Sequence, residues 1–170
     1  MVFGPLILFA IMKTFFFSPF LVDGDSMMPT LKSGEFFAVD RLTYQEELPK
    51  RDDIVVFYLS DDPSYYYVKR IIGIPGDHIH LEKDGVYMVD PQSSVRHKLS
   101  EPFIMPDPNP SPQFLSDSNE LGQDFTVPNG SYFVLGDNRE HSKDSRFFTE
   151  PFIPKNQLIG KFGFDIPINL

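Results

Sequence analysis

Ser26 lies in a segment whose residue types restrain the backbone on both sides of a hydroxyl, GDSMMPT at residues 24–30. Gly24 permits unusual backbone angles, while Pro29 fixes its own φ and favours an extended conformation for the residue before it. A serine held in this way presents its hydroxyl and its N–H in a fixed direction. The segment is not a GxSxG elbow, because Met28 stands two positions after Ser26. By spacing alone it also fits a structural serine in a turn.

A serine nucleophile requires a base, and histidine is the first residue type to consider. The four histidines are His78, His80, His97 and His141, and none lies in a recognisable triad context. His78 and His80 alternate on one strand face, but no third ligand is indicated. We therefore expect a solvated strand face there, and neither a metal nor a cofactor.

Lys69 is the other candidate base. On a strand it shares a face with Tyr67 and Ile71. In an apolar environment, desolvation lowers the pKa of a lysine from about 10.4 towards neutrality, which makes the lysine available as a base. The same pattern also fits a lysine at a strand edge whose amine reaches water.

Residues 136–146 form a charged cluster directly after a predicted strand, and six of these eleven residues are charged. Such a cluster is typical of a solvated loop. Alternatively, its side chains brace a site and orient a group within it. The candidates are Asp137, Arg139, Asp144 and Arg146 as paired charges, and Ser142 or Ser145 as the orienting hydroxyl.

The elements that must position these residues are short strands. After residue 22, β-branched and aromatic runs are bounded by Gly, Pro, Asp and Ser, which predicts a mainly β fold of antiparallel sheets. No stretch there keeps a 3.6-residue apolar period for long, although residues 43–48 fit one helical turn. The predicted strands are residues 35–39, 54–59, 65–74, 79–81, 86–89, 132–135 and 158–164.

Residues 1–22 differ from the rest of the chain, because Lys13 is their only charge. As a helix they would reach about 33 Å at ~1.5 Å per residue, close to the hydrocarbon thickness of a bilayer. A secretory signal peptide would show a basic n-region and a small-residue cleavage site, and both are missing. A buried core segment is the other alternative. We expect the segment Met1–Val22 to be the outer part of a membrane anchor.

Residues 23–170 are expected to form one β-rich catalytic domain. Seven prolines between residues 90 and 129 make long central strands improbable there, so we interpret this stretch as a Pro-rich excursion from the β-core. The net charge of −9 argues against nucleic acid as a partner. The absence of cysteine excludes disulfides, thiolate catalysis and Cys-bound zinc.

Several segments, in this order, resemble the type I signal peptidases, the membrane-anchored serine–lysine endopeptidases that remove secretory signal peptides. The matching segments are residues 14–20 (TFFFSPF), 23–31 (DGDSMMPTL), 34–35 (GE), 52–57 (DDIVVF), 67–77 (YVKRIIGIPGD), 134–139 (VLGDNR) and 158–161 (LIGK), together with Ser142, Asp144, Ser145 and Arg146.

The resemblance implies a role for each matching residue. Ser26 matches the nucleophile and Lys69 the general base, while Ser142 matches the serine that hydrogen-bonds the base. The oxyanion hole of the family uses the N–H of the nucleophile, with help from the residue two positions earlier, which is Gly24 here. The remaining matches belong to the charged loop that supports the site: Asp137, Arg139, Asp144 and Arg146.

The chain departs from the family pattern at His141, where asparagine is usual, and at Lys143, which adds a charge beside Ser142. Phe147 and Phe148 also replace an aromatic residue followed by glycine. We expect these departures to change the packing of the loop and the efficiency of the enzyme, but they do not touch Ser26 or Lys69.

The resemblance implies a cell-membrane enzyme with an extracytoplasmic catalytic domain. Its expected partners are membrane lipid and signal peptides with small residues before the cut. A self-cleaving repressor-type Ser–Lys peptidase is one alternative; it predicts a DNA-binding helical domain before the serine, where 25 residues stand. A non-enzymatic, membrane-tethered β module is the other.

Overall fold

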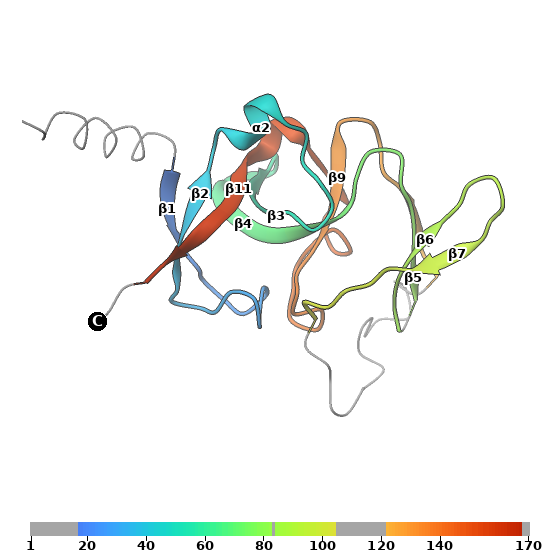
Figure 1. Ribbon diagram of the computed structural model, residues 1–170, viewed down its shortest axis with the longest axis horizontal. Coiled ribbons are helices and arrows are strands. Elements are labelled where there is room, and N and C mark those ends of the chain that lie inside the picture. Colours follow the sequence, from blue (N-terminus) through green and yellow to red (C-terminus); the bar gives the residue numbers. More distant parts are fainter. Residues whose placement is uncertain (1–16, 83, 105–121, 168–170) are drawn as a thin grey trace, which may run out of the picture.

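The computed structural model describes residues 17–82, 84–104 and 122–167, which fold into two antiparallel sheets (Figure 1). In the described chain the larger sheet has seven strands in the order β1-β2-β11-β3-β4-β9-β10. Their bounds are β1 (Phe17–Leu21), β2 (Phe36–Asp40), β3 (Ile54–Leu59), β4 (Asp62–Gly73), β9 (Ser131–Leu135), β10 (Phe152–Pro154) and β11 (Leu158–Ile166). A single helical turn, α2 (Thr43–Glu46), follows β2, and a 3-10 turn, η2 (Lys155–Gln157), precedes β11.

The smaller sheet has the order β7-β6-β5-β8 and lies to the right in Figure 1. It is built from β5 (His78–Glu82), β6 (Gly85–Val89), β7 (Arg96–Lys98) and β8 (Asp124–Thr126). One apolar cluster joins the two sheets, because Ile79 of β5 packs with Ile72 of β4 and with Phe133 of β9. The smaller sheet is thereby fixed against the end of the larger one.

Strand β4 supplies side chains to three separate apolar clusters, because neighbouring residues of a strand point to opposite faces. Ile71 belongs to the cluster of Phe57 and Val134, while Ile72 belongs to the cluster that joins the sheets. Val68 packs against a third cluster, which contains Met27. Lys69 therefore lies on a strand that is covered on both faces.

The mainly β, antiparallel fold predicted from the sequence is confirmed. Each of the seven predicted strands corresponds to an observed one, namely β2, β3, β4, β5, β6, β9 and β11. The prediction missed β1, β7, β8 and β10. Strands β7 and β8 arise from the Pro-rich excursion and have three residues each, which agrees with the expectation that prolines exclude long strands there.

The predicted end of the apolar segment at Val22 needs correction. Residues Phe17–Leu21 form the edge strand β1, which pairs antiparallel with β2, and Phe20 packs on Phe37 and Tyr66. An apolar run has the same composition in a sheet as in a bilayer, so the sequence could not separate the two. The rest of the predicted anchor, residues 1–16, lies outside the described residues. None of the helices in the described ranges has the length and hydropathy needed to cross a membrane.

Candidate active site

The side chains of Ser26 and Lys69 meet although they come from distant parts of the chain. Ser26 lies in the turn that follows β1, and Lys69 lies within β4. The Lys69 Nζ donates a hydrogen bond to the Ser26 Oγ at 2.7 Å and another to the carbonyl oxygen of Val68 at 2.8 Å. The structure therefore brings together the two residues that the sequence singled out as hydroxyl and base.

Lys69 is only 4% exposed, which excludes the alternative of a strand-edge lysine whose amine reaches water. Burial lowers its pKa to about 8, because the charged ammonium loses its hydration. The nearby carboxylates of Asp144 and Asp137 raise this pKa, and the guanidinium of Arg146 lowers it, but desolvation is the largest effect. An amine with this pKa is partly neutral near physiological pH and can accept a proton from a hydroxyl.

Ser142 lies beside this pair, but the expected hydrogen bond to Lys69 is not formed in the structure. Its Oγ is buried and has no hydrogen-bond partner within the described residues. Gly136 separates Ser142 from the serine segment, and a Cβ at Gly136 would collide with the Ser142 Oγ and with the carbonyl oxygen of Ser26. Ser142 is thus next to the site with an unused hydroxyl.

The backbone of the serine segment is held by Asn138. Its N–H donates to the carbonyl oxygen of Ser26 at 3.1 Å, and its side-chain Nδ2 donates to the carbonyl oxygen of Asp25 at 3.0 Å. Gly24 takes φ +93°, and its N–H donates to the Ser33 Oγ at 3.2 Å. Gly24 is therefore near the site but already uses its own N–H.

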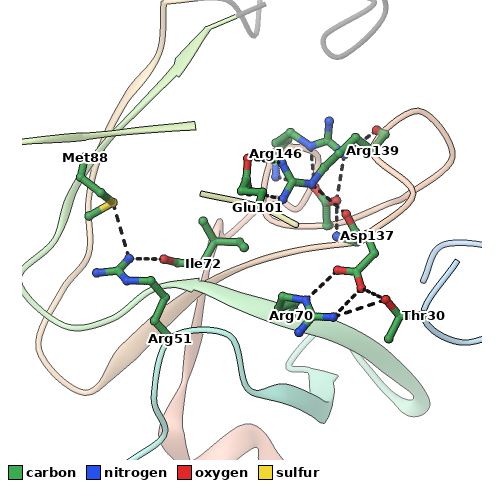
Figure 2. A network of polar contacts seen from close by, with 11 residues as sticks. Thr30, Arg51, Arg70, Ile72, Met88, Glu101, Asp137, Arg139 and Arg146 are labelled. Atoms are coloured by element: carbon green, nitrogen blue, oxygen red, sulfur yellow. Dashed lines mark hydrogen bonds and ion pairs between the residues drawn. The ribbon is translucent and has the colours of Figure 1, made fainter. Parts of the chain in front are cut away.

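Four of the six charged residues of the loop are buried, namely Asp137, Arg139, Asp144 and Arg146, and only two of these four pair with each other. The Arg146 guanidinium donates to both carboxylate oxygens of Asp144, at 2.8 and 2.9 Å, and Asp144 also accepts the N–H of Gly136 at 2.9 Å. Each of the four takes part in an ion pair, but not all of the partners belong to the loop. Asp137 instead pairs with Arg70 of β4, and Arg139 pairs with Glu101 of the Pro-rich excursion (Figure 2).

A hollow of about 590 Å³ opens beside the Ser26–Lys69 pair. Its walls come from the end of β1 and the segment after it, from β4 and from the charged loop. The lining residues include Phe20, Val22, Ser26, Met27, Tyr65, Tyr66, Tyr67, Val68, Lys69, His141 and Lys143. Met27, next to Ser26, is thus one of the apolar residues that line this hollow.

The departures from the family pattern fall into two groups. His141 and Lys143 are exposed and line the hollow. Phe148 is buried, with its ring centroid 5.5 Å from that of Tyr67 and 6.2 Å from that of Phe57, whereas Phe147 is exposed beside Arg146. The loop behind the site is therefore anchored in the core by Phe148.

His78 and His80 make contacts across the small sheet. The His80 Nδ1 lies 2.7 Å from the Asp124 Oδ1, and the His78 Nδ1 lies 3.1 Å from the Thr126 Oγ1. Across the described ranges, no group of three or more His, Cys, Asp or Glu side chains is arranged to hold a metal ion. These histidines lie on β5, outside the hollow.

Comparison with known proteins identifies the family. Residues 1–166 match the family model described as signal peptidase, peptidase S26. The chain is 40% identical over 164 residues to signal peptidase I of Bacillus caldolyticus, covering 91% of this chain and 82% of that protein. It is 36% identical over 171 residues to signal peptidase IB of Staphylococcus aureus, covering 94% and 82%. A crystal structure of a signal peptidase I from Enterococcus faecalis V583 matches with a TM-score of 0.45 at 28% identity, covering 68% of this chain and 97% of that one.

The chain therefore belongs to the signal peptidase family, peptidase S26. Its function is that of a type I signal peptidase, a serine peptidase that removes signal peptides from secreted preproteins. The resemblance stated from the sequence is thus confirmed.

Sequence reasoning missed three contributors to the site. Asn138 and Arg70 stand in matching segments, but nothing in the pattern indicated that they hold the Ser26 backbone and Asp137. Glu101 stands among prolines and gave no signal at all, because its partner Arg139 is distant in sequence.

Proposed function

We propose that Ser26 is the nucleophile and Lys69 the general base of this peptidase. The 2.7 Å hydrogen bond between the Lys69 Nζ and the Ser26 Oγ carries the proposal, because it provides a direct path for the proton. Neutral Lys69 accepts the Ser26 proton as the Oγ attacks the scissile carbonyl carbon. The resulting ammonium then donates this proton to the leaving amine, and an ester between Ser26 and the signal peptide remains. Water, deprotonated by Lys69, attacks this ester and releases the signal peptide.

The negative oxygen of the tetrahedral intermediate requires hydrogen-bond donors. The N–H of Ser26 fits this role, since it donates to no protein atom in the parts of the chain that the structure describes. Gly24 has no side-chain hydroxyl to add, and its own N–H is directed to Ser33. We assign Gly24 the role of shaping the turn next to the oxyanion site.

Ser142 is proposed to orient Lys69. Its buried Oγ has no partner in the structure and lies across Gly136 from the carbonyl oxygen of Ser26. In this role the Ser142 hydroxyl forms a hydrogen bond with the Lys69 amine during catalysis. Asp137, Arg139, Asp144 and Arg146 hold the loop that places Ser142.

The dyad is tested by replacing its members singly and together. Ser26→Ala and Lys69→Ala should each lower kcat for a preprotein peptide by about three powers of ten or more, and the double variant should be hardly worse than either, because the two residues act as a unit. Circular dichroism controls for folding. Cleavage by Lys69→Ala at a near-normal rate would contradict the mechanism.

The substrate class proposed is a signal peptide with small residues at the first and third positions before the cut. An extended peptide beside the serine segment pairs through its backbone, so alternate side chains point into the hollow. Phe20, Val22 and Met27 give that hollow apolar walls next to Ser26. Large side chains at these two positions would collide with the walls.

Replacing Ala by Phe at the first position before the cut should reduce cleavage strongly, whereas the same replacement at the second position should matter much less. Mass spectrometry of the products shows whether the cut stays at the same bond. Equal sensitivity at the two positions would refute the alternate-pocket arrangement.

We further propose that residues 1–16 are the membrane-anchoring segment and that the catalytic domain lies on the extracytoplasmic side. Their apolar composition supports the anchor, the family resemblance supports the side, and β1 follows residue 16 directly and reaches the hollow. Deleting residues 2–16 should leave cleavage of a soluble peptide detectable while weakening cleavage of preproteins presented in lipid vesicles. An equal loss on both substrates would contradict a membrane role. The deletion must stop before Phe17, because β1 belongs to the sheet.

A further inference from the structure

Glu101, which follows β7 within the Pro-rich excursion, forms a buried ion pair with Arg139 of the charged loop. Its two carboxylate oxygens face the guanidinium of Arg139, Oε1 against Nη2 and Oε2 at 3.3 Å from Nη1. The two side chains are 7% and 2% exposed. A two-point, water-poor pair of this kind fixes the orientation of the guanidinium.

Arg139 is also hydrogen-bonded to the rest of the loop, through its side chain and through its backbone. Its Nε donates to the carbonyl oxygen of Gly136 at 2.9 Å, and its own carbonyl oxygen accepts a hydrogen bond from the Arg146 Nη2 at 2.8 Å. Gly136 lies close to both Ser142 and the carbonyl oxygen of Ser26, since a Cβ at this position would collide with both. The carboxylate of Glu101 is therefore linked to the proposed nucleophile through one arginine and one glycine.

Phe103 contacts the other arginine that holds this loop. The centroid of its ring lies 4.0 Å from the guanidinium carbon of Arg70. Arg70 donates hydrogen bonds to both carboxylate oxygens of Asp137, at 2.8 and 2.6 Å (Figure 2). Residues Gly136 and Asp137 are thus each held by an arginine that the segment 101–103 contacts. Asn138, the next residue, holds the carbonyl oxygens of Ser26 and Asp25.

We propose that Glu101 is a positioning residue for the catalytic serine, acting through Arg139 and the loop at residues 136–138. The inference rests on the proposed role of Ser26. In this way the Pro-rich excursion contributes to catalysis, because it contacts the arginines that hold the loop against the serine backbone.

The test is the variant Glu101→Gln, which keeps the shape of the side chain and removes its charge. The buried guanidinium of Arg139 then loses the carboxylate of Glu101 and moves, so the loop no longer holds Ser26 in place. Since misplacement of about 1 Å can cost a hundredfold in rate, we expect kcat for a soluble peptide to fall about ten- to a hundredfold. KM should change less than twofold, because neither Glu101 nor Arg139 lines the hollow.

Glu47→Gln is the matched control. Glu47 also pairs with a cation, Lys50 at 2.6 Å, but this pair is exposed. Its kcat should stay within twofold of the parent. Rates are measured on the full chain in detergent, per folded molecule as judged by near-ultraviolet circular dichroism.

A double-mutant cycle shows whether Glu101 affects kcat through Arg139 or independently of it. Arg139→Gln and the combination of Glu101→Gln with Arg139→Gln should have the same kcat, because Glu101 has no further effect once its arginine is gone. If the two losses multiply instead, Glu101 does not act through Arg139 and the proposal is overturned.

Should Glu101→Gln fold poorly, Glu101→Asp replaces it, since it keeps the charge but is one methylene too short for both contacts. Its kcat should still fall severalfold at unchanged KM; a parental kcat in the folded variant overturns the proposal. Ser26→Ala is measured in parallel. If Ser26→Ala is inactive while Glu101→Gln cleaves normally, only the positioning role fails, whereas normal cleavage by Ser26→Ala removes the proposed mechanism itself.

Discussion

The N–H of Asn138 donates a hydrogen bond to the carbonyl oxygen of Ser26, with 3.1 Å between the two atoms. This bond joins the charged loop to the serine segment at the residue that carries the reactive hydroxyl. Gly136 lies against the same carbonyl oxygen, so the loop and the serine can approach this closely only without a side chain there. The position of Ser26 is therefore set by the loop.

Gly136→Ala tests this close approach. The new Cβ would overlap the Ser142 Oγ and the carbonyl oxygen of Ser26, and both groups belong to the site. Overpacking at a buried position commonly costs about 1–3 kcal/mol of stability, and here the strain falls on the serine segment. We expect kcat per folded molecule to fall at least tenfold, roughly what small misplacements of reacting groups cost. Stopped-flow cleavage of a peptide measures it, and an unchanged kcat would show that Ser26 does not depend on this contact.

Ser142→Ala should separate catalysis from stability. The Ser142 Oγ is buried without a partner among the described residues. The substitution therefore removes an unsatisfied polar atom from the interior, and with it the cost of its desolvation. We expect the midpoint of urea unfolding to stay the same or rise, while kcat falls. If activity is lost only in proportion to folded protein, Ser142 has no role in orienting Lys69.

Ser145→Ala should have the opposite outcome. The Ser145 Oγ accepts the buried N–H of Val134 at 2.9 Å. Removing it leaves this N–H unpaired, which costs about 1–3 kcal/mol. Stability should therefore fall, while kcat per folded molecule stays close to the parent. A stable but inactive Ser145→Ala variant would reverse the assignment of the two serines.

Asp137→Asn should change both stability and the pH dependence of the rate. It leaves the buried Arg70 guanidinium without its counterion, and breaking a buried pair in this way typically costs about 3–5 kcal/mol. The Asp137 carboxylate also raises the pKa of Lys69, so its neutralisation should lower that pKa and shift the pH midpoint of the rate to lower pH. A midpoint that moves to higher pH would contradict the electrostatic account.

The sequence could predict what depends on alternation along one strand. Lys69, Tyr67 and Ile71 share a face of β4, as the pattern required, and the strand itself was predicted within a few residues. The burial of Lys69 could not be predicted from this alternation. It depends on the segment around Met27 and on the charged loop, which reach β4 only through the fold.

Edge strands and ion pairs were the weak points of the prediction. Strand β1 lay hidden in an apolar run, because Phe20 is equally suited to a bilayer and to the core beside Phe37. The sequence named Asp137 and Arg139 as paired charges but gave no partner for either, because spacing says nothing of residues that are distant along the chain. The actual partners, Arg70 and Glu101, come from other elements.

The central claim is that a neutral, buried Lys69 takes the proton from Ser26, and the pH dependence of the single-turnover rate tests it most directly. Single-turnover conditions with excess enzyme isolate the chemical step from product release. A pKa of about 8 means that the neutral fraction of Lys69 grows about ninetyfold between pH 6 and pH 9. The rate should follow it, rising about tenfold per pH unit below the midpoint and levelling off above pH 8. A rate that stays flat from pH 6 to pH 9, or falls as the pH rises, would contradict the claim.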